Sequence, residues 1–174
     1  MFLASDAPAD VPNYERAFAH RPEAYAAWVT LNTTIKAGMS ARRYELVSIA
    51  VARTLRSTYC CVAHAKAALD SDLASPSDLA DPATLPPVER AIVAFAEQVA
   101  RDAAAIGAED VAALREHGLS DQDVLDVVLA ATARCFFAKT LDAVGAQADA
   151  RFAALEPAWL RDALTVGRPI ASGA

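Results

Sequence analysis

The chain contains 174 residues, of which 55% are hydrophobic and 22% are charged, and its formal net charge is −6. This apolar content excludes a disordered chain, because disordered segments lack the apolar surface that folding buries. The acidic balance argues against a nucleic-acid-binding face, which needs clustered positive charge. The length suits one hydrophobic core, so we expect a single domain over residues 1–174.

The sequence also bears on where the protein works. Residues 1–10 contain two Asp and no Lys or Arg, so they lack the basic start of a secretory signal. No run of about 18 uncharged apolar residues is present, and we expect no association with a membrane. Three cysteines do not make a secreted disulfide framework. We therefore expect a cytoplasmic protein.

Helix-forming residues dominate the segments between the prolines and glycines. Ala alone supplies 43 positions, and no alternating β-branched run with hairpin turns occurs. The sequence therefore predicts an all-α fold. In chain order, the expected helices cover about residues 14–20, 22–37, 41–56, 58–71, 87–105, 109–116, 121–144 and 157–164.

Capping residues and breakers set these bounds. Ser40 and Ser120 are expected N-caps, and Gly38 and Gly145 follow expected helix ends. Residues 71–87 hold four prolines among Asp and Ser, so we predict a loop there. The helix over residues 121–144 is almost wholly apolar and is expected to be central and buried.

The candidate chemistry lies in residues 45–64. Cys60 and His64 are four residues apart and so share one face of a helix. Ser57 or Thr58 as N-cap would place the Cys60 thiol in a first helical turn, where the helix dipole favours the thiolate. Glu45 lies on the preceding helix and reaches the same site if the two helices are antiparallel. Such a group forms a proton relay, in which the carboxylate orients the imidazole.

Simpler interpretations of these residues stay open. A free cysteine is among the most buried residue types and most often only fills space. Zinc is not expected, because adjacent cysteines on a helix diverge and a second ligand pair is missing. Arg53 and Arg56 either stabilise the thiolate or face solvent.

Residues 40–70 resemble the alkylhydroperoxidase AhpD-like and carboxymuconolactone decarboxylase superfamily. Its peroxidase members carry a Glu, then Cys-x-x-Cys, then a His four residues after the second Cys. Glu45, Cys60 and His64 match this pattern, and Tyr59 stands where the family often has His or Tyr. Further similar segments, at residues 86–96 and 114–145, extend the resemblance to about residues 20–150.

The resemblance implies both a fold and an activity. The expected fold is an AhpD-like bundle of about six to eight helices, with its core at about residues 20–150. The implied activity is a thiol peroxidase that reduces alkyl or hydrogen peroxides through Cys60, with His64 and Glu45 moving the proton. Ser57 and Tyr59 would support the thiol, and neither a metal nor an organic cofactor is expected.

One position departs from the family pattern. Ser57 stands where two-Cys members have the first Cys, which resolves the sulfenic acid as a disulfide. A peroxidase-related subset is similar in having Ser-x-x-Cys with the His retained. Cys61 is adjacent to Cys60, but a vicinal disulfide within a helix is strained. Cys135 is a second alternative, although a core thiol beside two Phe residues is the simpler interpretation, and we rank a small external thiol first.

Two other functions remain possible from the sequence. One is a lactone-acid enzyme like the carboxymuconolactone decarboxylases, and the other is a non-catalytic redox sensor. For a peroxidase, the partners would be a peroxide substrate and a small thiol or protein reductant. Because Ala side chains bury little area each, we also expect a homo-oligomer, whether dimer, trimer or hexamer.

Overall fold

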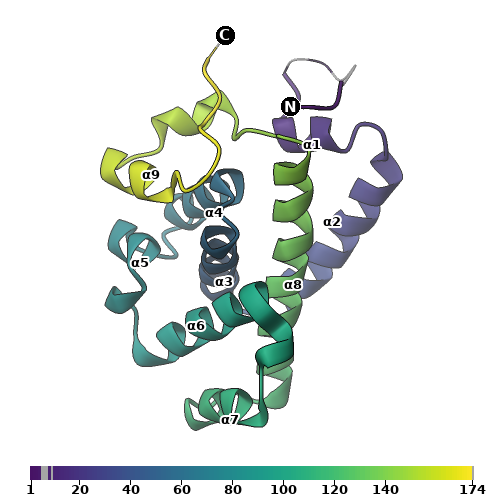
Figure 1. The fold of residues 1–174 in the computed structure, drawn as a ribbon. Coiled ribbons are helices and arrows are strands. Elements are labelled where there is room, and N and C mark those ends of the chain that lie inside the picture. The colour runs from purple at the N-terminus through teal and green to yellow at the C-terminus, as the bar shows by residue number, and fades with distance from the viewer. Residues whose placement is uncertain (5–7, 9, 174) are drawn as a thin grey trace.

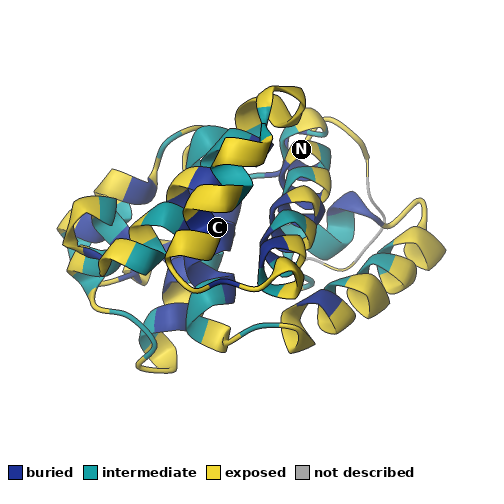
Figure 2. Cartoon of the chain, turned by 90° about the horizontal axis from the view of Figure 1, so that it is seen from below, coloured by how far each residue is buried: buried dark blue, intermediate teal, exposed yellow. Residues whose placement is uncertain are grey.

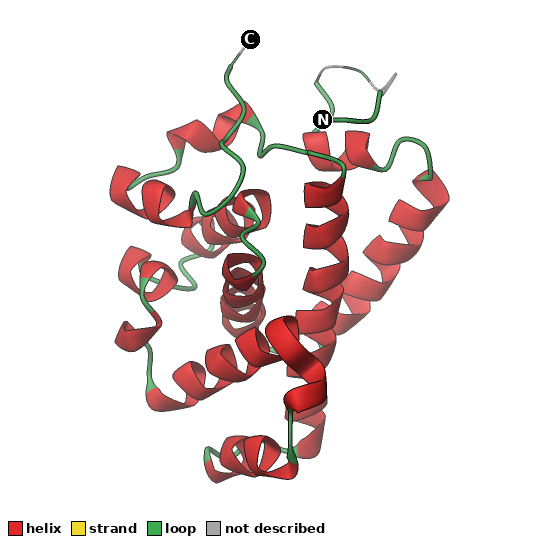
Figure 3. Ribbon diagram, in the orientation of Figure 1, coloured by secondary structure: helices red, strands yellow, loops and turns green. Residues whose placement is uncertain are grey.

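The computed structural model describes residues 1–4, 8 and 10–173, and this part of the chain is helical, with no strand (Figures 1 and 3). The predicted all-α fold is confirmed, and seven of the α-helices have seven or more residues. The acidic N-terminus used above lies partly outside the described residues. The α-helices are α1 (Asn13–Ala17), α2 (Pro22–Ala37), α3 (Ala41–Thr54), α4 (Thr58–Asp70), α5 (Pro76–Ala80), α6 (Pro87–Asp102), α7 (Ala108–Glu116), α8 (Asp121–Ala143) and α9 (Ala158–Leu164). Short 3₁₀ turns occupy Pro82–Thr84, Ala103–Ala105 and Ala150–Ala154.

The predicted caps at Ser40, Ser120 and Gly145 are present, whereas Ser57 stands at the N-cap position of α4 without a side-chain cap hydrogen bond. The Ser40 hydroxyl accepts a hydrogen bond from the Arg43 backbone N–H at the start of α3. At the start of α8, Ser120 and Asp123 form a reciprocal capping box. Gly145 follows α8 in the left-handed region at φ 73°, which suits a residue without a Cβ.

The prediction of a loop over residues 71–87 was wrong in part, because α5 and a 3₁₀ turn lie there. Ser75 caps α5 and forms a capping box with Asp78, while Pro76 occupies the first helical turn. These are start signals of a helix, so the prolines here begin helices rather than only interrupt them.

Helix α3 lies at the centre of the packed helices. It packs against α4, α6 and α8, and nine consecutive residues, 44–52, are buried. Figure 2 shows buried residues on the sides of the helices that face one another, whereas α2 is mostly exposed. Within the described residues, no helix is long and apolar enough to cross a membrane.

Helix α8 is less buried than its composition suggests. One face packs on α3, α6 and α2, as expected for a core helix. The opposite face exposes Leu125, Leu129 and Phe136, of which Leu125 is 55% exposed. The prediction of a central, buried helix was therefore wrong for this face, because apolar composition does not show which residues lack a covering neighbour.

The turn between α3 and α4 positions the candidate thiol. Arg56 adopts a left-handed conformation at φ 58°, and the Ser57 N–H donates to the Ala52 carbonyl across the turn. The C-terminal segment packs on this turn, since the Gly167 N–H donates to the Thr58 hydroxyl at 2.9 Å. The last residues of the chain thereby hold the start of the helix that carries Cys60.

We predict that Gly167→Ala destabilises the protein by about 1–3 kcal/mol. A Cβ at residue 167 would lie 1.9 Å from the Arg56 carbonyl oxygen, so the backbone must shift. The matched control is Gly173→Ala, because no atom lies within 4 Å of that Cβ position. Urea unfolding of the two variants measures the difference, and equal stability would contradict close packing of this segment on the turn.

Candidate active site

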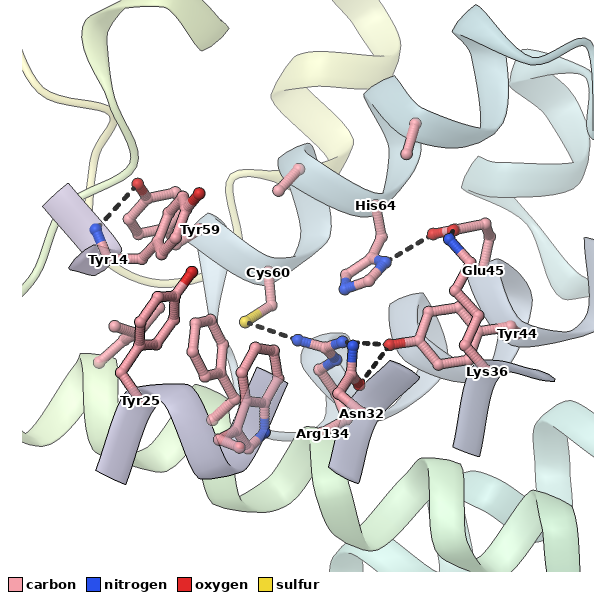
Figure 4. A pocket seen from close by; sticks show the side chains of 15 residues that line it. Tyr14, Tyr25, Asn32, Lys36, Tyr44, Glu45, Tyr59, Cys60, His64 and Arg134 are labelled. Atoms are coloured by element: carbon pink, nitrogen blue, oxygen red, sulfur yellow. Dashed lines mark hydrogen bonds and ion pairs between the residues drawn. The ribbon is translucent and has the colours of Figure 1, made fainter. Parts of the chain in front are cut away.

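A pocket with a volume of about 280 Å³ opens between α1, α2, α3, α4 and α8. Figure 4 shows Cys60 in the middle of it, with aromatic side chains on one side and polar side chains on the other. The aromatic wall comprises Tyr14, Tyr25, Trp28 and Phe137, and the Trp28 and Phe137 rings stack 4.0 Å apart. The polar side comprises Asn32, Lys36, Tyr44, Glu45, His64 and Arg134.

Glu45 and His64 meet in this pocket as the sequence predicted. The His64 Nδ1 atom lies 2.5 Å from Glu45 Oε2, which links α4 directly to α3. Glu45 is buried, and its other carboxylate oxygen lies 3.5 Å from the Lys36 ammonium nitrogen. The packing of α3 against α4 thus brings the carboxylate to the imidazole without an intervening group.

The environment keeps His64 neutral. Burial and the nearby Arg134 cation lower the pKa of His64 to about 4, although the hydrogen bond to Glu45 opposes this shift. Burial pushes the pKa of Glu45 up, but His64 and Lys36 outweigh it and leave that pKa lowered. Glu45 is therefore an anion that accepts the Nδ1–H, and Nε2 of His64 is the atom available to accept a proton.

Cys60 is in the first turn of α4, as predicted, but its environment differs from the prediction. The residue is only 2% exposed, and burial raises the pKa of the Cys60 thiol. The expectation that the helix start would favour the thiolate was therefore wrong for the resting pocket. Desolvation of a thiolate outweighs the helix-end effect when the sulfur is removed from water.

Arg134 is the site residue that the sequence analysis missed. Its Nη1 atom lies 3.9 Å from the Cys60 sulfur, and its positive charge opposes the rise in the thiol pKa. It is 3% exposed and stands among apolar residues of α8. A single charge within an otherwise apolar stretch was the signal that would have marked it, because an arginine is rarely buried without a purpose.

Two polar side chains position Arg134. Its Nη2 donates to the Tyr44 hydroxyl at 3.0 Å, and that hydroxyl donates to Asn32 Oδ1 at 2.6 Å. Among the described residues, no carboxylate lies within ion-pair distance of Arg134, and its Nε has no hydrogen-bond partner. The pocket thus contains a buried cation without a protein anion beside it.

The two predicted supporting residues are both buried next to Cys60 in sequence, but their hydroxyls differ in role. The Ser57 Oγ atom has no hydrogen-bond partner among the described residues. The Tyr59 hydroxyl donates to Asp149 at 2.7 Å and accepts from the Tyr14 N–H at 3.1 Å. Tyr59 therefore ties α1 to the pocket rather than bonding to the thiol.

The remaining cysteines lie outside the pocket lining. All three cysteines are free; Cys61 is fully buried in the core, and Cys135 packs at the edge of the cluster formed by α3, α6 and α8. Burial raises the pKa of both thiols. Arg53 and Arg56 donate to the carbonyls of Ala80 and Val166 instead of serving the thiol.

Comparison with known proteins supports the resemblance. Residues 22–81, which include Glu45, Cys60 and His64, match the carboxymuconolactone decarboxylase family. A crystal structure of an alkylhydroperoxidase AhpD core, an uncharacterized peroxidase-related protein from Ralstonia eutropha JMP134, is similar with a TM-score of 0.72 and 24% identity. The alignment covers 82% of this chain and 79% of that one.

A second solved structure has the same fold. It is an uncharacterized peroxidase-related protein from Silicibacter sp. TM1040, with a TM-score of 0.69, 23% identity and coverage of 83% and 80% of the two chains. A search of curated proteins found no significant match. The family match and the shared fold together confirm the resemblance to the AhpD-like carboxymuconolactone decarboxylase superfamily.

We predict that acid weakens the fold through His64. The unfolded chain takes up a proton near the ordinary histidine pKa of 6.5, whereas the folded chain does so only near 4. Stability is therefore complete above pH 6.5 and falls as the pH drops through this window, by about 2 kcal/mol at pH 5. Urea unfolding at pH 8 and pH 5 measures the loss.

The matched control for this prediction is His20→Gln, because His20 is exposed and lies outside the pocket. That variant should keep the full pH dependence, whereas His64→Gln should reduce it. Equal stability of the unaltered protein at pH 8 and pH 5 would contradict a neutral His64.

Proposed function

We propose that the protein is a thiol peroxidase that uses Cys60 as its nucleophile. The observation that carries the proposal is the meeting of three groups in one pocket: a thiol, a carboxylate-held imidazole and a buried guanidinium. The thiol supplies the electrons, the imidazole accepts and returns the proton, and the guanidinium stabilises negative charge. The peroxidase-related names of the two solved proteins with this fold agree with the proposal.

Cys60, His64, Glu45 and Arg134 account for the protons and electrons that the proposed reaction with the peroxide requires. The Cys60 proton passes to Nε2 of His64, and Glu45 stabilises the resulting imidazolium. The thiolate, held by Arg134, attacks the terminal oxygen of the hydroperoxide, and the O–O bond breaks. The leaving alkoxide takes the proton from His64, so that Cys60 becomes a sulfenic acid and the peroxide becomes an alcohol.

Arg134 compensates for the low basicity of His64 in this scheme. Burial disfavours both the thiolate and the imidazolium, so proton transfer between them is uphill. A guanidinium near the sulfur lowers the energy of the thiolate, and Glu45 does the same for the imidazolium. Arg134 and Glu45 thus favour the same proton transfer, because one stabilises the thiolate and the other stabilises the imidazolium that it produces.

The second half of the cycle needs a reductant from outside the chain. Neither Cys61 nor Cys135 lines the pocket, and Ser57 has no thiol. We propose a small thiol or a protein thiol as reductant, in a cytoplasmic setting where such thiols are kept reduced.

A second candidate is a proton-transfer enzyme acting on a carboxylated lactone. The match of residues 22–81 to the carboxymuconolactone decarboxylase family favours it, as does the buried cation facing a histidine–glutamate pair. That chemistry requires His64 and Glu45 but no thiol. A redox sensor, by contrast, would oxidise Cys60 without turnover.

Replacement of Cys60 separates these functions. We predict that Cys60→Ser lowers peroxide consumption in the presence of a small thiol by about 10³-fold or more, because a hydroxyl does not ionise near neutral pH. The matched control is Cys135→Ser, which removes a thiol outside the pocket and should retain the activity. An oxygen-electrode or ferrous-xylenol orange assay gives the rates.

The other outcomes of this experiment are distinct. Full peroxide consumption by Cys60→Ser would contradict the thiol mechanism, and lactone turnover by that variant would favour the second candidate. A stable Cys60 sulfenic acid that no thiol reduces, seen by mass spectrometry, would favour the sensor.

We also propose that the chain self-associates through the exposed apolar face of α8. Leu125 and Leu129 are one turn apart, and Phe136 continues the same face. We predict that the protein is oligomeric in light scattering and that Leu129→Glu shifts it towards the monomer mass. Trp159→Glu alters an exposed residue of α9 and is the control. A monomer mass for the unaltered chain would contradict the proposal.

A further inference from the structure

The structure bears on which thiol regenerates Cys60, a question that rests on the proposed peroxidase function. Cys60 is the one cysteine among the pocket-lining residues, and all three cysteines of the chain lie in the described part. Its neighbour Cys61 is fully buried in the core and adjacent in the same helix. The sulfenic acid must therefore meet its reductant inside the pocket.

Oxidation of Cys60 leaves this pocket without an anion beside Arg134. The thiolate that attacks the peroxide is the anion that faces Arg134, whose Nη1 atom lies 3.9 Å from the sulfur. A sulfenic acid is neutral, so Arg134 is then a buried cation with no carboxylate within ion-pair distance in the described chain. A desolvated charge without a partner is unfavourable, and an anion that enters beside it is stabilised.

The other charges of the pocket do not cancel this one. Glu45 is committed to His64 and to Lys36, and His64 is neutral. Lys36 balances Glu45, and its side chain is 50% exposed where the pocket meets solvent. With Cys60 oxidised, the lining carries one net positive charge, located at Arg134.

The pocket dimensions favour a small molecule. A volume of about 280 Å³ is at the lower end of the range for small-ligand sites. The stacked rings of Trp28 and Phe137 give the short carbon chain of such a molecule an apolar wall. Arg134 lines this pocket with its Nη1 atom towards the Cys60 sulfur, so a carboxylate that enters beside the sulfur can accept a hydrogen bond from the guanidinium.

We propose that the reductant is a small thiol that carries a carboxylate, and that Arg134 recognises its negative charge. The thiolate of this molecule attacks the Cys60 sulfur and displaces hydroxide, which takes a proton and leaves as water. The product is a mixed disulfide between Cys60 and the reductant. A second molecule of the thiol attacks that disulfide, which restores Cys60 and releases the oxidised reductant as a symmetrical disulfide.

The experiment compares three thiols of similar size on the unaltered protein. Cys60 is first oxidised with one equivalent of peroxide, and the rate of loss of its sulfenic acid is then followed by stopped-flow fluorescence with quenched mass spectrometry. The reductants are 3-mercaptopropionate, its neutral amide 3-mercaptopropionamide, and the cationic cysteamine. Each rate is corrected for the fraction of the reductant that is present as thiolate. It is then divided by the rate at which the same thiol reacts with a small disulfide, which removes differences in intrinsic nucleophilicity between the thiols.

We expect 3-mercaptopropionate to react about tenfold faster than its amide, and cysteamine to react more slowly than the amide. Arg134→Met should abolish the advantage of the carboxylate, and Arg134→Lys should retain part of it. The matched control is Lys66→Met, which removes an exposed cation of α4 outside the pocket and should leave the ratio unchanged.

The outcomes separate this inference from the function on which it rests. If peroxide yields no sulfenic acid on Cys60, the proposed peroxidase function fails. If the sulfenic acid forms but the carboxylate and amide thiols reduce it at equal normalised rates, the function stands and recognition of the anion is overturned. A carboxylate advantage that persists in Arg134→Met would assign recognition to another residue and overturn the role of Arg134. The comparison of the three thiols uses the unaltered protein, so it tests recognition of the carboxylate even if Arg134→Met does not fold.

Discussion

The hydrogen bond between Glu45 and His64 joins α3 and α4 at the point where the chemistry is proposed. A buried carboxylate is tolerated only when its lost hydration is replaced, and here His64 and Lys36 replace it. The same bond fixes the ring of His64 and leaves Nε2 as its basic atom. The contact that fixes how α3 packs against α4 is therefore the same contact that decides which nitrogen of His64 carries the proton.

A second balance acts on the thiol of Cys60. Burial disfavours its ionisation, while the guanidinium of Arg134 favours it. Burial outweighs the guanidinium, so the resting cysteine is a thiol that is protected from indiscriminate reaction. A ligand that brings an electrophilic oxygen to the sulfur lets Arg134 stabilise charge as it develops, which is the condition for electrostatic catalysis. Burial of Cys60 in the pocket thus accounts both for the protection of the resting thiol and for its reactivity beside Arg134.

The sequence predicts the part of the site that is local. Cys60 and His64 are one helical turn apart, and Glu45 lies on the adjoining helix, so periodicity and one antiparallel turn bring them together. Arg134 comes from α8, 74 residues after Cys60, and only tertiary packing places it at the sulfur. The ionisation of Cys60 was mispredicted for a related reason, because a helix-end argument contains no information on burial. The α5 helix is not predicted although Ser75 and Asp78 can cap it, because the four prolines of residues 71–87 also indicate a loop.

Ser57 connects the local sequence to the shape of the pocket. A cysteine one turn before the nucleophile condenses with the sulfenic acid to form a disulfide within the chain, and the reductant then acts on that disulfide. Here residue 57 is a fully buried serine, so the sulfenic acid of Cys60 itself must meet the second molecule that carries electrons. An enclosed site that receives two different ligands in sequence benefits from a residue that serves both steps. Arg134 is such a residue, because it stabilises the thiolate that attacks the peroxide and is left without an anion beside it once the sulfur is a neutral sulfenic acid. Ser57, which cannot form a disulfide with Cys60, and the buried guanidinium of Arg134 thus act in the same catalytic cycle.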